Sequence, residues 1–517
     1  MTKNLVNAVE LKLFASRITA ICDEMGVVLR RAAFSPNIRD RLDFSCALFG
    51  RDGRLIGQAA HIPVHLGSMA FAMGDLVSDR SWCPGDMLVV NDPYLGGTHL
   101  PDITIIAPVF LNNVLVGFVA NRAHHANVGC NTPGSMPLAQ RLEEEGIVIP
   151  PTLLFASGQL QQFCLGLLEI PGPGLSGDLA AQVGANQVGA QRLCELVNRV
   201  GYASYAIGAG ELNDYADRIM KKLLLSLRHG VYRFEDFLDD DGFVDLVIPL
   251  SVMLTIHEDG VDLDFSGSAH MVRGNLNCPE SVVAAAVYYC FRCLLPEESP
   301  SCSGLFQRLK VKTKRGSILN AKRPAAVAAG NVETSTRLVD LIFGALAQAL
   351  PEKIPAASQG TMNNVAMGRV DPESGERWDY YETVAGGLGA GPSADGLNCA
   401  QSHMTNTLNT PVEVLEMTYP LRVTRYAERR GSGGKGITTG GNGVIKEYEF
   451  LEPAQLTLLT ERRRFAPWGL AGGEDGAKGK NLLNGLSLPG KCSLTVNAGD
   501  RLEIRTPGGG GWGAETQ

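Results

Sequence analysis

The sequence lacks the long apolar runs, the basic clusters and the leader-like start that would point to a membrane or to nucleic acid. No stretch of about 18 uninterrupted apolar residues occurs, so we expect no membrane span. Lysine and arginine number 46 against 54 acidic residues, giving a net charge of −8. No basic patch is visible, and the arginine run at residues 462–464 is too short to indicate a nucleic-acid partner. The start, MTKNLVNAVELKLF, does not have the basic-then-apolar order of a signal peptide.

Several motifs of common enzyme classes are also missing. There is no G-x-x-x-x-G-K-[ST] phosphate loop and no G-x-S-x-G nucleophile elbow. The glycine-rich segment GSGGKG at residues 431–436 is followed by strand and turn sequence rather than by a helix. We therefore expect no nucleotide or other organic cofactor on this chain.

The 12 cysteines are scattered over the 517 residues, which does not suggest a disulfide framework and favours a cytoplasmic protein. Cys290 and Cys293 form a C-x-x-C pair inside an apolar helical stretch. No second pair stands at zinc spacing. We predict that the pair belongs to the packed core rather than to a metal or redox site.

Glycine is what the sequence has in excess, with 60 residues against an average usage of about 7%. The glycines follow no three-residue period, which excludes collagen. They occur in short runs, beside residue 96 and again after about residue 385. Such runs indicate tight turns or close backbone approach. We expect the first run to shape a loop and the second to build turns and part of a channel or interface.

Hydrophobic periodicity predicts an α+β protein of several domains, with a metal site on a β-hairpin and a glycine-rich, mainly β C-terminal region. The chain never settles into βαβ alternation and has no repeat of fixed period. We expect three parts: an N-terminal metal-site domain at 1–230, a mixed middle region at 231–375 and the glycine-rich region at 376–517. The predicted helices are residues 9–33, 65–79, 178–228, 281–295 and 335–350.

Histidine clustering is the strongest chemical signal, because five of the nine histidines fall between residues 61 and 125. His99 and Asp102 precede a predicted hairpin whose turn is Asn112-Asn113, and the returning strand carries His124 and His125. A hairpin centred between the two asparagines pairs His124 with Pro101, whereas one centred on the second pairs it with Asp102. Facing side chains have Cβ atoms about 5 Å apart. Either register brings imidazole and carboxylate together, which suits zinc, manganese or iron, but the choice between His124 and His125 stays open.

Three further residues are weaker candidates. Asp43 is a carboxylate entering an apolar strand, where a metal, an ion pair or a cap could each be its partner. His61 and His65 stand four apart, but Pro63 between them argues against a continuous helix carrying both. Two roles remain open for these histidines: they line a pocket, or they make hydrogen bonds that stabilise the local structure.

The motifs resemble the hydantoinase B family over residues 10–513. This family includes the B subunits of ATP-dependent N-methylhydantoinase and caprolactamase, the C-terminal half of 5-oxoprolinase and the alpha subunits of acetone carboxylase. The segments that carry the resemblance are RLDFSCALF, QAAHIPVHLGSM, NDPYLGGTHLPDITIIAPVF, RAHHANVG, GNVETSTRLVD, PVEVLEMTYPLRV, PWGLAGG and TPGGGGWG. Departures from the family pattern are Asp40 for Glu, His270 for Gln and Thr439 for Arg, and they bear on substrate identity.

The resemblance implies one divalent metal, zinc or manganese, held by His99, Asp102 and His124 with Asp43 as a fourth ligand. It thereby favours His124 over His125 as the ligand. We expect the open position to bind water, and His65 or His125 to serve as a proton shuttle.

The resemblance further implies a metal-dependent hydrolytic subunit that opens a lactam, hydantoin or 5-oxoproline ring. The ring would first be phosphorylated by a separate hydantoinase A-type subunit using ATP and magnesium, in an α2β2 assembly. The D-x-G-G-T segment of that kinase-like half is absent here. The alternatives are a ketone carboxylase subunit and a non-catalytic partner that stabilises the A-type chain.

Overall fold

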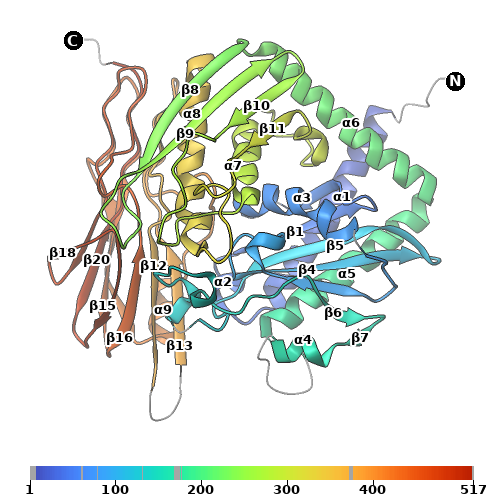
Figure 1. Ribbon diagram of the computed structural model, residues 1–517, viewed down its shortest axis with the longest axis horizontal. Helices are drawn as coiled ribbons and strands as arrows, with labels where there is room; N and C mark the ends of the chain where they lie inside the picture. Colours follow the sequence, from blue (N-terminus) through green and yellow to red (C-terminus); the bar gives the residue numbers. More distant parts are fainter. Residues whose placement is uncertain are drawn as a thin grey trace.

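The computed structural model describes residues 7–59, 62–78, 80–130, 132–167, 175, 177–371 and 377–514 (Figure 1). The helices are α1 (Ala8–Ala32), α2 (Pro36–Arg39), α3 (Pro63–Ser78), α4 (Gln162–Leu167), α5 (Gly177–Val200), α6 (Tyr202–Ser226), α7 (Glu280–Cys293), α8 (Ser335–Ala349) and α9 (Val412–Thr418). The strands of the first half are β1 (Phe44–Gly50), β2 (Leu55–Ala59), β3 (Met87–Val90), β4 (Asp102–Leu111), β5 (Val114–His124), β6 (Thr152–Ala156), β7 (Gln159–Leu160), β8 (Gly230–Leu238), β9 (Ile248–His257) and β10 (Gly260–Asp264). Those of the second half are β11 (Leu309–Lys312), β12 (Asn364–Val370), β13 (Arg377–Thr383), β14 (Leu421–Arg429), β15 (Gly443–Phe450), β16 (Ala454–Leu459), β17 (Lys480–Leu483), β18 (Leu486–Leu488), β19 (Lys491–Val496) and β20 (Arg501–Arg505).

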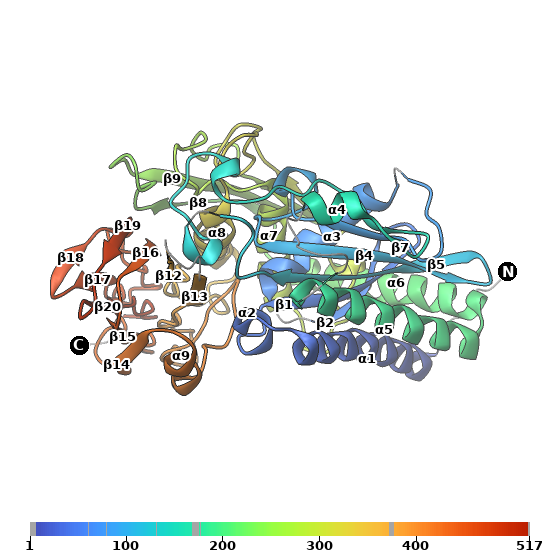
Figure 2. The same cartoon turned by 90° about the horizontal axis from the view of Figure 1, so that it is seen from below.

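The N-terminal part is built on a seven-stranded sheet with the order β2-β1-β5-β4-β3-β6-β7. Helices α1 and α5 pack on one face, while α3 lies on the other face with α7 beyond it (Figure 2). Helix α1 starts with a capping box in which Asn7 and Glu10 satisfy each other's backbone amides. Both faces of the central strands are therefore covered, which explains their largely apolar sequences.

The β4–β5 hairpin combines both registers considered from the sequence. Asn112 and Asn113 have φ of 49° and 63°, and Leu111 pairs with Val114, so the turn is centred between the two asparagines. A register shift between Val109 and Phe110 then moves the pairing by one residue. Beyond this shift, at the far end of the hairpin, Asp102 pairs with His124.

The second half of the chain adds three more sheets. Strands β8 to β11 form a four-stranded sheet against which α8 packs. The remaining strands form a sheet β13-β12-β16-β19 and a sheet β14-β15-β20-β17-β18, at the left in Figure 1. One hydrophobic core extends from α1 to α8, and a second fills the space between the two C-terminal sheets. The division at residues 230 and 375 stays a prediction.

Most of the later glycines serve close packing. We name residues 387–396, 433–441, 469–476 and 508–511 the glycine layer, because these extended segments lie side by side through backbone hydrogen bonds. Gly509 donates to Gly441 O at 2.9 Å and accepts from Gly434 N at 2.9 Å. A Cβ on Gly509 would lie 1.9 Å from the carbonyl oxygen of Leu388. Such a contact leaves no room for a side chain, so this glycine provides space rather than the predicted turn geometry.

The long predicted helices agree with α1, α3, α5, α6, α7 and α8, and the mixed α+β architecture is confirmed. The segment after Ser35 forms the short helix α2. All 12 cysteines are free, and Cys290 is buried whereas Cys293 is exposed. Within the described ranges, no helix combines the length and the apolar composition needed to cross a bilayer.

Candidate metal centre

His99, Asp102 and His124 form a buried cluster at one end of the large sheet. One donor atom from each lies within 4.8 Å of the others, and no second group of three His, Cys, Asp or Glu side chains gathers in this way in the described ranges. His99 Nε2 lies 3.1 Å and His124 Nδ1 lies 3.6 Å from Asp102 Oδ1. All three side chains are at most 3% exposed, so the cluster is shielded from bulk water.

Local backbone geometry brings these side chains together. Asp102 is the first residue of β4 and His124 the last of β5, and the register shift in the hairpin pairs them. His99 stands in the preceding loop, where Gly96 has φ of 108° and a Cβ on Gly97 would lie 2.3 Å from Asn91 O. Neither position tolerates an ordinary side chain, which fits the sharp turn expected at this glycine pair.

Neighbouring side chains hold one oxygen of the Asp102 carboxylate, Oδ2, and leave the second oxygen, Oδ1, without a hydrogen bond. Oδ2 accepts a hydrogen bond of 2.6 Å from Thr98 Oγ1 and one of 3.4 Å from Asn331 Nδ2. His65 Nε2 lies 3.2 Å from the same oxygen. His65 Nδ1 in turn lies 3.3 Å from Ser45 Oγ. These contacts fix the carboxylate so that Oδ1 faces the two other members of the cluster.

The electrostatics of the cluster keep Asp102 ionised. Burial opposes ionisation, but the neighbouring imidazoles, His99 first and then His65, hold the pKa of Asp102 well below its usual range. Burial also disfavours the charged form of His99, yet the attraction of Asp102 prevails and raises its pKa. For His124 burial prevails and lowers the pKa. Asp102 as carboxylate and His124 as neutral imidazole are in the donor state that metals require, whereas His99 would release its favoured proton when it binds a cation.

The cluster fits a divalent cation because its polar atoms lack other partners. Both ring nitrogens of His99, Asp102 Oδ1 and His124 Nε2 are buried, and none makes a hydrogen bond within the described part of the chain. A buried polar atom left without a partner costs about 1–3 kcal/mol. Imidazole and carboxylate are ligands for zinc and manganese alike. His99, Asp102 and His124 could therefore hold such an ion.

Asp43 lies at the edge of this cluster, directly before β1. Its Oδ2 is 4.0 Å from His124 Nδ1 and 3.9 Å from Arg41 Nη2. His124 N donates to Asp43 O at 3.0 Å, which ties the end of β5 to the start of β1. Asp43 lines the same narrow pocket as the three cluster residues. It is thus placed to act as a fourth ligand, with Arg41 as a competing partner.

The two proton-shuttle candidates are separated by the sheet. His65, in the first turn of α3, lines the pocket. His125 Nε2 bonds Gln182 Oε1 of α5 at 2.8 Å, and His125 does not line the pocket. Only His65 therefore reaches the cluster. His61 falls outside the described residues.

The distant part of the chain supplies pocket residues that the sequence reasoning missed. The Tyr381 ring stacks on His124 with ring centroids 5.0 Å apart, and Arg41 lies 4.9 Å above the Tyr381 ring. Asn331 comes from the π-helical turn Gly330–Thr334, and Thr405 comes from the loop before α9. In the sequence, only its family resemblance marks the GNVETS segment. The π-helical turn, frequent at functional sites, has no sequence signal of its own.

A sequence model of the family described as hydantoinase B/oxoprolinase matches residues 7–515, which is nearly the whole chain. The chain belongs to this family. It is 37% identical to 5-oxoprolinase 1 of Arabidopsis thaliana over 99% of its own length, but spans only 42% of that protein. It is 30% identical to the B subunit of a putative D-/L-hydantoinase from a Pseudomonas species, with 98% and 90% of the two chains covered.

Solved structures agree with this family assignment. The ATP-dependent caprolactamase of Pseudomonas jessenii has 28% sequence identity and a TM-score of 0.90, with 99% of this chain and 92% of that chain covered. An acetone carboxylase structure has a TM-score of 0.84 at 19% identity, covering 98% of this chain and 76% of that chain. The second comparison shows the shared fold alone.

A sizeable cavity lies away from the cluster. It measures about 790 Å³ and is bounded by α1, α6 and residues 297–301. None of the predicted ligands lines it, and its charged residues include Lys12, Asp23 and Arg218. The unpartnered donor atoms of His99, Asp102 and His124 lie in the narrower pocket and not in this cavity.

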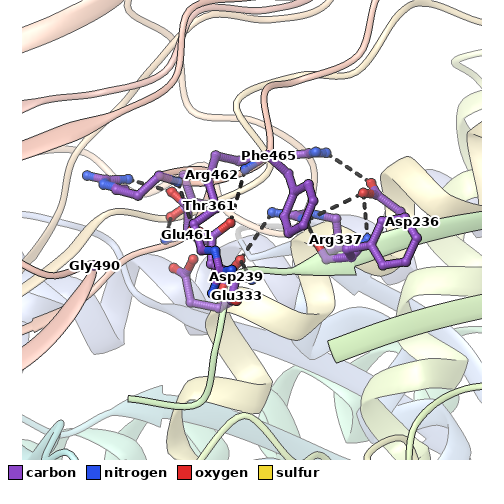
Figure 3. Close-up of polar contacts among 12 residues, drawn as sticks. Asp236, Asp239, Glu333, Arg337, Thr361, Glu461, Arg462, Phe465 and Gly490 are labelled. Atoms are coloured by element: carbon purple, nitrogen blue, oxygen red, sulfur yellow. Dashed lines mark hydrogen bonds and ion pairs between the residues drawn. The ribbon is translucent and has the colours of Figure 1, made fainter. Parts of the chain in front are cut away.

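Behind the pocket, a buried network of ion pairs joins α8 to the C-terminal sheets (Figure 3). Glu461 contacts Lys491 Nζ at 2.5 Å and Arg337 Nη2 at 3.3 Å. Arg462 Nη2 lies 2.6 Å from Asp340 Oδ2 and 3.1 Å from Asp236 Oδ2. Arg462, the first residue of the short basic run at 462–464, is therefore part of a structural ion-pair network.

Glu333 lies between this network and the metal cluster, and it yields a testable pH dependence. Its Oε1 accepts hydrogen bonds from Met362 N and Asn364 Nδ2. Burial, helped by the charge of Glu461, raises the pKa of Glu333 to about 7. A raised carboxyl pKa means that the folded state binds the proton more tightly than the unfolded chain. The contribution of Glu333 to stability is thus present below pH 4.5 and is lost as pH rises toward and past 7.

We expect Glu333→Gln to lower the pH dependence of the unfolding free energy between about pH 5 and 8, by on the order of 2–3 kcal/mol. Glutamine keeps the acceptor oxygen but cannot ionise. Urea denaturation at several pH values measures the difference from the unmodified protein. The exposed Glu258→Gln serves as a control that should change nothing. Parallel stability curves for Glu333→Gln and the unmodified protein would contradict the assignment.

Proposed function

We propose that this chain is the hydrolytic subunit of an ATP-dependent cyclic amide hydrolase. The observation that supports this most directly is the buried His99, Asp102 and His124 cluster with unpartnered donor atoms, in a chain of the hydantoinase B/oxoprolinase family. A relative named as the B subunit of a hydantoinase supports a separate partner chain. We propose an A-type, ATP- and magnesium-using partner in an α2β2 assembly located in the cytoplasm.

A cyclic amide resists hydrolysis because its nitrogen donates electrons into the carbonyl. In the proposed reaction the partner phosphorylates the carbonyl oxygen, which removes this resonance and creates a leaving group. The activated ring then reaches the pocket lined by His65, Tyr381 and the proposed ligands. Zinc or manganese would be held by His99, Asp102 and His124, with Asp43 as fourth ligand. When bound, the ion supplies Lewis acidity that makes a water nucleophilic near neutral pH.

The protein residues hold and orient the reacting groups. Thr98 and Asn331 fix the Asp102 carboxylate, and Tyr381 sets the plane of the His124 ring. His65, bracketed by Ser45 and Asp102, is positioned to hold a proton at Nε2. We propose His65 as the residue that passes a proton as the ring opens.

The test is reconstitution with a hydantoinase A-type partner, using ATP and a panel of hydantoin, 5-oxoproline and caprolactam. We expect ring opening of at least one substrate, dependent on ATP, on the metal and on both chains. Bicarbonate-dependent consumption of a ketone would instead indicate a carboxylase. If the pair opens the ring at the full rate when this chain holds no metal, the metal has no part in hydrolysis. The chain would then only stabilise its A-type partner.

A further inference from the structure

Three threonine hydroxyls line the wall of the pocket that comes from the C-terminal part. Thr383 ends β13, while Thr405 and Thr407 lie in the loop before α9. We name these residues the threonine cluster. They are between 2% and 5% exposed, and they share the pocket with the proposed metal ligands. The same loop reaches across to the N-terminal part, since Val64 N donates to Met404 O and Leu408 N donates to Arg41 O.

The direction of the hydrogen bonds in this cluster is fixed at one end. Thr383 Oγ1 accepts from Arg41 Nη2 at 3.4 Å and from Gln401 Nε2 at 3.2 Å. A guanidinium can only donate. The Gln401 nitrogen also faces the carbonyl oxygen of Thr383, which identifies it as the amide donor. Both lone pairs of Thr383 Oγ1 are therefore occupied, and its own hydrogen must point to Thr407 Oγ1, 2.9 Å away.

Counting the remaining hydrogens leaves one without an acceptor. Thr405 and Thr407 carry two hydroxyl hydrogens, and the contact between their oxygens at 3.3 Å uses one of them. Thr407 N also donates to Thr405 Oγ1, which occupies a lone pair of that oxygen and leaves its hydrogen unaffected. The described residues give neither hydroxyl a further acceptor. One hydroxyl hydrogen, on Thr405 or Thr407, is thus available to an occupant of the pocket.

This free donor is backed by a buried positive charge. Arg41 is fully buried and heads the chain of hydroxyls, and hydrogen bonds in series polarise one another. A hydroxyl at the end of such a chain is a better donor to an anionic oxygen than an isolated threonine would be. The pocket therefore has cation-binding donors on one wall and an oriented donor for an oxyanion on the other.

We propose that the threonine cluster, with Arg41 behind it, is a subsite for the phosphoryl oxygens of the activated substrate. The proposal rests on the proposed function, in which the substrate carries a phosphoryl group when it enters the pocket. The same tetrahedral oxyanion is presented by the phosphate released on ring opening. Inorganic phosphate is therefore a suitable probe of the subsite on this chain alone.

The test measures binding of inorganic phosphate to the metal-loaded full chain by isothermal titration calorimetry. We expect Thr405→Val/Thr407→Val to weaken phosphate binding by about tenfold or more, because valine keeps the shape but removes the donor. Metal content should be unchanged. Thr405→Ser/Thr407→Ser should bind phosphate within about threefold of the unmodified protein, since serine restores the hydroxyls. Thr457→Val, a buried threonine in β16, is the matched control.

Equal phosphate affinity for the unmodified and double-valine proteins would overturn the proposal, as would no phosphate binding to the unmodified protein. If the double variant loses metal, one of the single valine variants must reproduce the weakened binding with metal retained, and failure of both would also overturn it. If the double-valine variant binds caprolactam more weakly but phosphate with unchanged affinity, the free threonine hydroxyl donates to the neutral carbonyl of the substrate instead of to its phosphoryl group. Phosphate binding needs neither ATP nor the partner, so its result is separate from that of the ring-opening test.

Discussion

Protein carrying His99→Ala, or His124→Ala, is expected to fold but to purify without its divalent metal. Each change removes one of three clustered donors and leaves the others unable to close a site. Because altering even an outer-shell partner typically costs about 10–100-fold in metal affinity, we expect loss of a ligand to cost at least about 100-fold. ATP-dependent ring opening by the reconstituted pair should fall by about 1,000-fold, since the water would lose its Lewis acid. Elemental analysis and a turnover assay measure the two effects.

The control for these variants is His257→Ala, which removes a half-exposed histidine paired with Asp262 at the β9–β10 hairpin of another sheet. It should keep both metal and turnover. If His99→Ala loses metal but turns over at the full rate, the proposed hydrolytic role of the cluster is wrong. If it retains metal with unchanged affinity, the ligand assignment is wrong.

Protein carrying Gly509→Ala is expected to lose about 3 kcal/mol or more of unfolding free energy, or to fail to fold. The new Cβ would lie 1.9 Å from Leu388 O and 2.2 Å from Leu388 C. Both are backbone atoms held by hydrogen bonds on either side, so they cannot move aside as a side-chain tip would. Urea denaturation followed by circular dichroism measures the loss.

Gly184→Ala provides the matched comparison for this prediction. Gly184 lies within α5, has no positive φ, and a Cβ there would meet nothing within 4 Å. Alanine should stabilise the helix by about 0.5–1 kcal/mol relative to glycine. Similar effects of the two substitutions would show that the glycine layer does not depend on close backbone approach.

The hairpin shows how far sequence reasoning could place the site. The apolar runs and the Asn112-Asn113 turn predicted β4 and β5 and brought Asp102 within one residue of His124. The register itself depends on the shift between Val109 and Phe110. The extra residue of this bulge is Val116 on β5, beside Gly117. A glycine inside a strand often marks a bulge, but it does not by itself say which register the strand ends adopt.

The opposite wall of the pocket could not be predicted in the same way. Tyr381 and Thr405 stand more than 250 residues beyond His124 in the sequence, and they meet the cluster only through the tertiary fold. Local periodicity reports on single elements and gives no information on such contacts. The glycine-rich segments were likewise recognised by composition, but their side-by-side packing has no turn motif that a sequence pattern could reveal.

The glycine layer also has a consequence for the order in which the protein can be assembled. Residues 387–396 and 433–441 are synthesised well before residues 508–511, which hydrogen-bond to both of them in the folded protein. Before that late segment arrives, the two earlier segments can bond to each other, as Gly441 N does to Leu388 O, but their bonds to 508–511 are missing and leave backbone edges exposed. The N-terminal hairpin with His99, Asp102 and His124 can form during translation. The glycine layer can be completed only after residues 508–511 have been synthesised. We therefore expect metal binding to be acquired earlier in biogenesis than a closed pocket.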